Sequence, residues 1–418
     1  MKNIFFYIVL FCFSLESCNN WLDVPSKTEV IDYDMFKTEQ GFMDVMSGVY
    51  YLMVRNELYG DMLTLTFLDM QARRFDLSNS YTVGTLGKNI GDAGYYEEST
   101  VNSVINNIWK KGYNVIANIN SLLEQIDKYQ SVFTYDNYRL IKGEALGLRA
   151  FIHFDLMRMF GKSYSETGNE LAIPYVTELS GRKWPLFFTQ DSVMIFALAD
   201  LKAAENLLEV DDLSTSSLEN SWINSRRSHF NLWAVYATMA RIYHWKGDTE
   251  NALLYAKKVI ESQQFEFFTP PTGVSPSGSR DVAFYSECIF SLYKDDLNDL
   301  YLDRMGWDIQ KTLHNQESDI EAVYETGAGG GTDYRFTWLW SRQVTTTSSK
   351  YNYYRYYTTI AEIPNLVTLL RWSEMYYIAA ECSGNTESGR AYLNEVRVNR
   401  GLTKLVEDIT DDTFEEVK

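Results

Sequence analysis

The chain has 418 residues, with 38 Lys and Arg against 56 Asp and Glu, and its formal net charge is −18 at pH 7. This length is ample for one large or two medium domains with a full hydrophobic core. The acidic balance argues against a nucleic-acid-binding protein and against a protein that lies flat on anionic lipid, because both partners require Lys and Arg.

The first predicted element is a secretory signal peptide at residues 1–17. Residues 4–13 carry no charge and follow Lys2. As a helix they would rise only about 15 Å, which is half of a bilayer's hydrocarbon core. The run therefore fits the apolar part of a signal peptide and not a membrane span. No other stretch of the chain is long and apolar enough to suggest a second anchor.

The signal peptide is followed by a cysteine in a distinctive setting. Residues 15–18 (LESC) resemble the lipobox of bacterial lipoproteins, in which the chain is cut before the cysteine and the cysteine is acylated. Glu16 departs from this pattern, which prefers a small or apolar residue there. Acyl chains on Cys18 would hold the protein on a membrane almost permanently. The alternative is an ordinary signal peptide with a chance cysteine.

A tether and a long amphipathic helix are expected next. Residues 18–35 form an extended lead-in that contains Pro25. A helix is predicted over about 38–54, because apolar residues recur three and four positions apart along one face, namely Phe42, Val45, Met46, Val49, Tyr50 and Met53. Residues 72–99 contain several glycines among Ser, Asn and Tyr, so we expect a long loop of the kind that often carries function.

The middle of the chain is predicted to be helical and to contain a repeat unit. The expected helices span about 101–128, 137–160, 192–209, 228–246 and 249–262, with Asp191 as the cap of the third. The last two show the small and aromatic spacing of a tetratricopeptide helix pair at Tyr236, Ala240, Tyr243, Gly247, Ala252, Ala256 and Val259. A weaker match lies at Ala379, Cys382, Thr386 and Ala391. Such pairs stack to share a core, so several are expected.

The last third begins with an irregular segment. Residues 264–363 open with several prolines, include a possible strand at 289–293, and carry a flexible glycine-rich tip at 327–331. Helices are predicted to return over about 367–383 and 387–400, with Gly401 ending the last.

Taken together, these segments resemble the SusD/RagB family of bacterial outer-membrane nutrient-binding lipoproteins. The resemblance rests on residues 21–25 (WLDVP) after Cys18, 113–123 (YNVIANINSLL), 142–145 (KGEA), 148–151 (LRAF), 154–156 (FDL), 160–161 (FG), 200–205 (DLKAAE), 371–374 (RWSE), 379–381 (AAE), 393–397 (LNEVR) and 400–402 (RGL). Family members normally continue into further C-terminal helices, so this sequence is expected to lack a C-terminal family segment.

The resemblance implies a mostly α fold, with tetratricopeptide-like helix pairs packed against a loop-rich half. We expect one SusD-like domain over 36–418, with the helical repeat elements at about 36–57, 101–160, 192–262 and 366–401. The loop-rich segments 72–99 and 264–363 would form the ligand face. The family implies a lid over a SusC-type TonB-dependent transporter, which receives a captured oligosaccharide or, for some members, a peptide.

The candidate ligand-binding residues lie in those two segments. A glycan receptor needs exposed rings for the apolar faces of sugars and polar neighbours for their edges. The first segment offers Arg73, Arg74, Asp76, Asn79, Tyr81, Tyr95 and Tyr96. The second offers Trp307, Trp338, Trp340, Tyr351, Asn352, Tyr353, Tyr354, Tyr356 and Tyr357. The alternative is that most of these rings pack the core of their own half of the protein.

Catalytic and metal sites are not expected. The chain has four His, and they form neither an H-E-x-x-H motif nor a Cys/His spacing typical of a metal site. The adjacent carboxylates at 97–98 and 295–296 are more typical of solvated surface than of the acid and base of a glycosidase, which face each other across a cleft. Cys288 and Cys382 are expected either to be buried as small apolar side chains or to form one disulfide bond with each other. We therefore expect no enzyme, no metal and no cofactor.

The favoured function is a cell-surface lipoprotein of the outer membrane that captures an oligosaccharide and delivers it to a SusC-type TonB-dependent transporter. The alternatives are a peptide-binding member of the same family and a helical-repeat scaffold that binds no small ligand. A secreted glycan hydrolase is the least favoured reading.

Overall fold

The computed structural model describes residues 33–77, 84–91, 97–164, 170–179, 185–270, 281–306, 312–344, 349–353, 365–406 and 409–417. The signal peptide, Cys18, most of the tether, and the candidates Asn79, Tyr81, Tyr95, Tyr96, Trp307, Tyr354, Tyr356 and Tyr357 lie outside these residues. The described chain is mostly helical, which confirms the predicted fold class. None of the described helices has the length and apolar character that crossing a bilayer requires.

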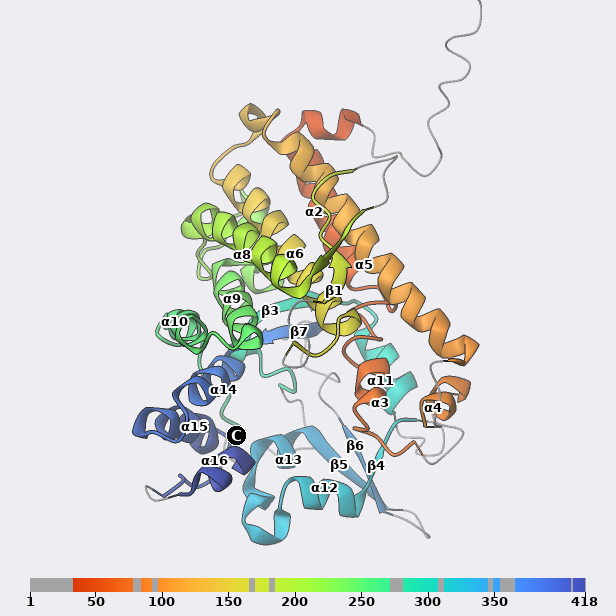
Figure 1. Cartoon of the computed structure of the whole chain (residues 1–418), viewed down its shortest axis with the longest axis vertical. Helices are drawn as coiled ribbons and strands as arrows, with labels where there is room; N and C mark the ends of the chain where they lie inside the picture. The colour runs from red at the N-terminus through yellow and green to blue at the C-terminus, as the bar shows by residue number, and fades with distance from the viewer. Residues whose placement is uncertain are drawn as a thin grey trace, which may run out of the picture.

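The N-terminal half is a layer of long helices (Figure 1). It comprises η1 (Tyr33–Lys37), α2 (Glu39–Met53), α5 (Ser99–Ile126), η3 (Gln130–Val132), α6 (Asn137–Phe160), α8 (Gln190–Leu207) and η4 (Leu208–Val210). Helix α5 packs against α2 and α6, and α6 packs against α8. The predicted apolar face of α2 is confirmed, since Phe42, Val45, Met46, Val49 and Met53 are all buried.

Close packing of α6 depends on a residue without a side chain. A Cβ added at Gly147 would lie 2.5 Å from the ring of Phe230, which is closer than real Cβ atoms approach. Phe230 lies two residues before α9 (Leu232–Lys246), after the short helices η5 (Ser221–Ile223) and η6 (Arg226–Ser228). Gly147 therefore sets how closely α6 and the start of α9 can approach.

The predicted helix-pair repeat is present. Helix α9 packs on α10 (Thr249–Ile260), α10 on α14 (Trp372–Ser383), and α14 on α15 (Glu387–Asn399), so the four form a continuous stack along one side of the molecule (Figure 1). The rings of Tyr243 and Tyr255 stack between α9 and α10 with centroids 5.7 Å apart. A further helix, α16 (Asp411–Val417), was not predicted, and its Phe414 is buried beside Leu393.

Two local predictions about helix starts are wrong. Helix α8 is capped by Thr189, whose hydroxyl accepts from the backbone N–H of Ser192 at 3.3 Å, and not by Asp191. The helix predicted from residue 367 begins only at Trp372, because β7 (Leu366–Arg371) occupies the preceding stretch. Periodicity alone cannot separate a short, fully buried strand from a buried helix turn.

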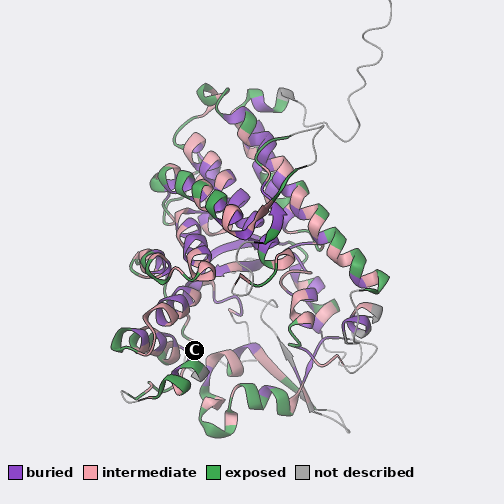
Figure 2. Cartoon of the chain, in the orientation of Figure 1, coloured by how far each residue is buried: buried purple, intermediate pink, exposed green. Residues whose placement is uncertain are grey.

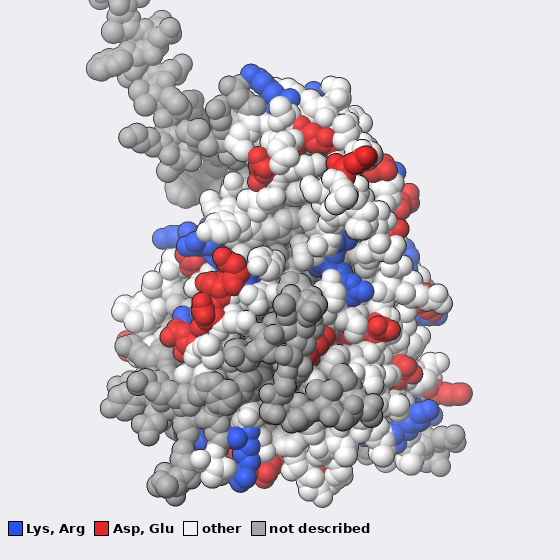
Figure 3. Space-filling model, turned by 180° about the vertical axis from the view of Figure 1, so that it is seen from behind, with Lys and Arg blue, Asp and Glu red and all other residues white. Residues whose placement is uncertain are grey.

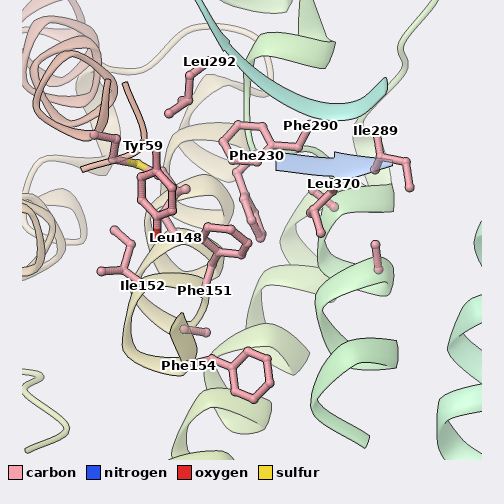
Figure 4. Close-up of a cluster of buried hydrophobic side chains, with 14 of the residues drawn as sticks. Tyr59, Leu148, Phe151, Ile152, Phe154, Phe230, Ile289, Phe290, Leu292 and Leu370 are labelled. Carbon is pink, nitrogen blue, oxygen red and sulfur yellow. The ribbon is translucent and has the colours of Figure 1, made fainter. Parts of the chain in front are cut away.

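Strand β7 pairs antiparallel with β3 (Cys288–Tyr293), where the sequence had suggested a strand. Figure 1 shows this two-stranded sheet at the centre of the molecule. Its residues Phe290 and Leu370 meet Phe151 and Phe230 in the main core, which Figure 4 shows at close range. Ring centroids lie 5.3 Å apart for Phe230 and Phe290 and 6.2 Å apart for Phe151 and Phe290.

The segments predicted as loops contain regular structure where they are described. Helix α3 (Phe67–Gln71) ends just before the first segment, which holds α4 (Gly84–Gly91). The second segment holds η7 (Tyr285–Glu287), α11 (Leu297–Met305), α12 (Glu317–Val323), η8 (Thr326–Ala328), η9 (Gly330–Thr332) and α13 (Tyr334–Leu339). A three-stranded sheet in the order β4-β6-β5 joins β4 (Asn315–Gln316), β6 (Ser349–Tyr353) and β5 (Trp340–Val344). A hairpin of β1 (Leu171–Pro174) and β2 (Phe187–Thr189) lies over α6 and α8. The prediction of irregular structure was wrong there.

Burial follows the layers (Figure 2). The stacked helices are exposed on their outer faces and buried where they meet one another and the central strands. Cys288 is buried and Cys382 partly buried, and both are free thiols, so the possible bridge between them is not present. The Cys288 sulfur lies 3.1 Å from the hydroxyl of Thr368 on the neighbouring strand.

Candidate ligand-binding site

A cavity of about 370 Å³ lies where the long helices meet the central sheet. Its walls come from the turns after α2, from α3 and the residues after it, from the C-terminal half of α6, from α9 and from β7. The lining residues are Tyr59, Leu63, Thr64, Leu68, Asp69, Arg74, Phe151, Asp155, Arg158, Met159, Arg241, Thr368 and Leu369. The lining thus combines apolar side chains with convergent charged groups, which is typical of small-molecule sites.

Each arginine of the cavity faces a carboxylate. Arg74 donates to Asp69 at 3.2 Å, and Arg158 pairs with Asp155 one helical turn earlier. The phenol of Tyr59 donates to the other oxygen of Asp155 at 2.8 Å. Burial, followed by the Asp155 carboxylate, raises the pKa of Tyr59 well above its ordinary value, so this phenol keeps its proton.

Arg241 forms the third pair and links the cavity to the helix stack. Its guanidinium donates to both carboxylate oxygens of Glu374 on α14, and to the backbone carbonyl of Leu369 on β7 at 2.9 Å. Burial opposes the charge of Arg241, but Glu374 outweighs it and raises the pKa of the guanidinium. A smaller cavity of about 300 Å³ continues beyond Arg158 and Arg241 to His244 and Glu381.

The two segments predicted to form the ligand face do meet beside this cavity. Asp76, from the first segment, donates its backbone N–H to the carbonyl of His314 at 2.9 Å, and its carboxylate accepts from the amide of Gln316. The amide of Asn315 donates to the carbonyl of Arg74. These contacts join positions about 240 residues apart in the sequence. The edge strand β4 thereby holds the segment 74–76 in place, with Arg74 at the cavity.

The described sequence candidates divide into two groups. Arg74 lines the cavity, Arg73 lies exposed next to it, and Asp76 anchors the segment to β4. Trp338 is only 4% exposed and packs with Phe268 and Phe284, while its indole N–H donates to the carbonyl of Asp281 at 2.9 Å. That ring is therefore part of a core cluster and offers no open platform.

Trp340 and Tyr351 lie in the three-stranded sheet. Trp340 is half-buried and donates its indole N–H to the hydroxyl of Tyr324 at 3.1 Å. Tyr351 is buried, with its ring 5.6 Å from that of Phe336. Nothing is described of the side chains of Asn352 and Tyr353, which follow in the same strand. The rings of Trp338 and Tyr351 are both buried by packing, Trp338 against Phe268 and Phe284, and Tyr351 against Phe336 of α13.

Several cavity residues had no sequence signal. Tyr59, Asp155, Arg158 and Arg241 lie on helices or turns outside the two predicted segments, and only the fold brings them to Arg74. Asp155 and Arg158 form an i,i+3 pair of α6, a pattern too common on helices to mark a site.

The cavity suits reversible binding of a hydroxyl-rich, neutral ligand. Each of the three guanidinium groups that line the cavity pairs with a carboxylate, Asp69 and Asp155 in the lining and Glu374 behind it, so neither a strongly anionic nor a strongly cationic ligand is favoured. Among the described residues, no cluster of His, Cys, Asp or Glu could hold a metal ion. On the face that Figure 3 shows, the acidic side chains form separate patches with basic ones between them.

Comparison with known families now places the chain. A model of the SusD-like family, described as starch-binding and associating with the outer membrane, matches residues 20–244, which is more than half of the sequence. The chain belongs to the SusD-like family. The family resemblance seen in the sequence is thereby confirmed, although this match itself ends within α9. Comparison with curated protein sequences gives no significant match.

Solved SusD structures share the fold over nearly the whole chain. A SusD superfamily protein from Bacteroides thetaiotaomicron is 21% identical, with a TM-score of 0.69 over 91% of this chain and 84% of that one. A SusD-like carbohydrate binding protein from Bacteroides vulgatus is 16% identical, with a TM-score of 0.68 over 91% and 79%. Surface glycan-binding protein A from Bacteroides uniformis is 18% identical, with a TM-score of 0.61 over 91% and 84%. At these identities the likeness concerns the fold.

Proposed function

We propose that this SusD-like protein is a lipid-anchored receptor of the outer-membrane surface that captures an oligosaccharide and passes it to a SusC-type TonB-dependent transporter. The observation that carries the ligand class is the balanced cavity beside Arg74, whose paired charges supply both donors and acceptors to sugar hydroxyls. Membership of a family described as starch-binding supports the same class. The protein binds its cargo and does not alter it.

The cavity residues have distinct roles in this proposal. The apolar side chains Leu63, Leu68 and Leu369 receive the less polar face of a sugar ring, while Arg74 and Asp69, at the more exposed side, exchange their mutual hydrogen bond for bonds to hydroxyls. Arg158 and Arg241 are held by Asp155 and Glu374, so they offer preorganised donors at little cost in side-chain entropy.

The test is calorimetry with maltoheptaose and with oligosaccharides of xylan, mannan, β-glucan and pectin. Replacing Arg74 by Ala should weaken the tightest interaction by about tenfold, the loss of one charged hydrogen bond. Arg139→Ala is the matched control, because this arginine lies at the N-terminal start of α6, at the opposite end from the cavity, and donates to the carbonyl of Asn206 and towards Glu209. If wild-type protein binds peptides and no glycan, the peptide-binding alternative replaces this proposal.

Membrane attachment is tested separately at the cysteine. We propose Cys18 as the acylated residue, so Cys18→Ala should abolish palmitate labelling and release the protein from the outer-membrane fraction. Retention of the variant at the membrane, without label, would point to an anchor other than the lipid. Co-purification with a TonB-dependent barrel from detergent extracts tests the transporter partner.

A further inference from the structure

A second hollow, of about 570 Å³, lies at the C-terminal end of α2. It is formed by the end of that helix and by the turn that follows β3, and its lining residues are Tyr51, Val54, Arg55, Asn56, Glu57, Tyr293, Lys294, Asp295 and Asp296. None of these residues lines the cavity beside Arg74. The hollow is therefore a separate feature of the surface.

Two exposed aromatic rings distinguish this hollow. Tyr51 is 60% exposed and Tyr293 is 56% exposed, although tyrosine rings that merely pack a core are covered. Neither was selected from the sequence, because Tyr51 lies on a helix and Tyr293 ends a strand. Arg55 orients Tyr51, since its guanidinium lies 5.7 Å from the ring centroid and donates to the phenol oxygen at 3.0 Å.

A buried lysine fixes the two walls of the hollow to each other. Lys294 is 5% exposed, yet its ammonium donates to the side-chain oxygen of Asn56 at 2.9 Å and pairs with Asp296 at 2.6 Å. Its backbone N–H donates to the carbonyl of Asn365, and the amide of Asn365 donates back to the carbonyl of Asp295, both at 2.9 Å. The turn that carries Tyr293 is thus held against the end of α2 before any ligand arrives.

The chemistry of the lining selects among ligand classes. Two cations, Arg55 and Lys294, stand against three carboxylates, Glu57, Asp295 and Asp296, so an anionic ligand is repelled. A cationic ligand would have to compete with Arg55 for Glu57, at 3.8 Å, and with Lys294 for Asp296, at 2.6 Å. A neutral ligand with an apolar face and hydroxyl edges can stack on the rings and bond to the polar groups without displacing either.

We infer that the hollow between Tyr51 and Tyr293 is a second carbohydrate-binding site of this protein. The ligand class rests on the proposed function, whereas the site itself rests on the exposed rings and the preorganised turn. A polysaccharide chain long enough to span both sites would engage the receptor at two points, which raises its affinity without new contacts at either site.

The experiment counts bound probe by calorimetry and uses maltoheptaose first, then the oligosaccharide panel named above. Wild-type protein should bind about two molecules per chain, and the double variant Tyr51→Ala with Tyr293→Ala about one. For a long polysaccharide of the same sugar, the affinity of the double variant should fall by at least about tenfold. Tyr135→Ala is the matched control, because Tyr135 is 68% exposed at a different place, before α6.

The outcomes separate the two proposals. An unchanged count in the Tyr51/Tyr293 variant, with binding lost in Arg74→Ala, overturns the second site and leaves the proposed function standing. Binding lost only in the tyrosine variant assigns the glycan to this hollow and overturns the cavity beside Arg74. Absence of binding by every probe overturns both.

A measurement on the wild-type protein tests the site even if the double variant misfolds. Tetranitromethane nitrates exposed tyrosines, and a probe bound in the hollow should slow nitration of Tyr51 and Tyr293 but not of Tyr135, as read by mass spectrometry of peptides. Equal nitration rates at all three tyrosines, with and without saturating probe, would count against the site.

Discussion

Arg149 on α6 and Asp200 on α8 form a largely buried, bidentate ion pair, with Nε and Nη2 each donating to one carboxylate oxygen at 2.7 Å. Both partners of this pair also form hydrogen bonds to other residues. Nη1 of Arg149 donates to the side-chain oxygen of Asn120 on α5 at 3.0 Å, and the phenol of Tyr175 donates to Asp200 at 2.6 Å. Burial and then the Asp200 carboxylate hold the pKa of Tyr175 well above its ordinary value. One network therefore joins three long helices and the end of β1.

Removing one partner of this pair should be costly. In Arg149→Met the charge of Asp200 would remain buried without its cation, and we expect the free energy of unfolding to fall by about 3–5 kcal/mol. Urea denaturation at pH 7 measures it. Lys142→Met, also on α6, is the matched control, because its partner Asp127 is 61% exposed and such surface pairs contribute less than about 1 kcal/mol. Equal losses in the two variants would contradict the argument.

His153 should make the fold sensitive to mild acid. This buried side chain is bonded as the neutral tautomer, since Nδ1 donates to the carbonyl of Arg149 at 2.8 Å and Nε2 accepts from the N–H of Val176 at 3.0 Å. Tyr175 stacks on the ring at 3.9 Å between centroids. Burial chiefly, with a contribution from the nearby Arg149 charge, lowers the pKa of His153 to about 3.

The sign of the effect follows from where the proton is bound. Between pH 6.5 and about 3 the unfolded chain protonates this histidine and the folded chain does not, so stability falls as the pH falls. The expected loss at pH 5 is about 2 kcal/mol, and His153→Gln should remove that part of the slope. A second buried group titrates at lower pH: burial alone would raise the pKa of Glu144, but Arg226 and His229 face it and lower the pKa to about 2. The stability that ionised Glu144 contributes is therefore lost only below about pH 4.5, outside the range tested for His153. Parallel stability curves for wild type and His153→Gln between pH 7 and 5 would contradict the assignment.

The helical part of this fold was predictable because its signal is local. Phe42 to Met53 repeat along one face of α2, and Tyr243 and Gly247 mark the α9–α10 turn, so sequence alone placed these elements closely. Residues 366–371 form a strand where the sequence predicted the start of a helix, and the reason is physical. Their buried apolar run fits a strand and a helix equally, and only pairing with Cys288–Tyr293 decides between them.

The site was predictable only in outline. Of the residues chosen by loop placement, Arg74 lines the cavity and Asp76 contacts β4, but the partners Tyr59, Arg158 and Arg241 meet Arg74 only through the fold. Aromatic content in a loop-rich segment could not separate exposed rings from packed ones. Trp338 fills a core cluster, whereas Tyr51, on a helix, is exposed.

The two tryptophans of the α13–β5 region should respond differently to substitution. Trp338→Ala empties a buried position beside Phe268 and Phe284, so we expect a loss of about 3–5 kcal/mol in unfolding free energy. Trp340→Phe keeps most of the ring and loses the hydrogen bond to Tyr324, with an expected loss of about 1 kcal/mol. Thermal unfolding followed by circular dichroism ranks the two. A fully stable Trp338→Ala protein with weakened glycan binding would instead restore this ring to the ligand face.

Two glycine-to-alanine substitutions should shift stability in opposite directions. Gly247 ends α9 in the left-handed conformation, with φ +77°, and a Cβ there would meet no neighbouring atom. The cost of Gly247→Ala in unfolding free energy is therefore purely conformational, about 1 kcal/mol.

Gly48 provides the opposite case. It lies inside α2 and also has open space around an added Cβ. Gly48→Ala should therefore raise the free energy of unfolding by about 0.5–1 kcal/mol, because alanine reduces the entropy of the unfolded chain. Because neither alanine touches another residue, the difference in urea midpoint isolates the backbone term. A stabilising Gly247→Ala would mean that the α9–α10 turn adopts a different conformation from the one seen here.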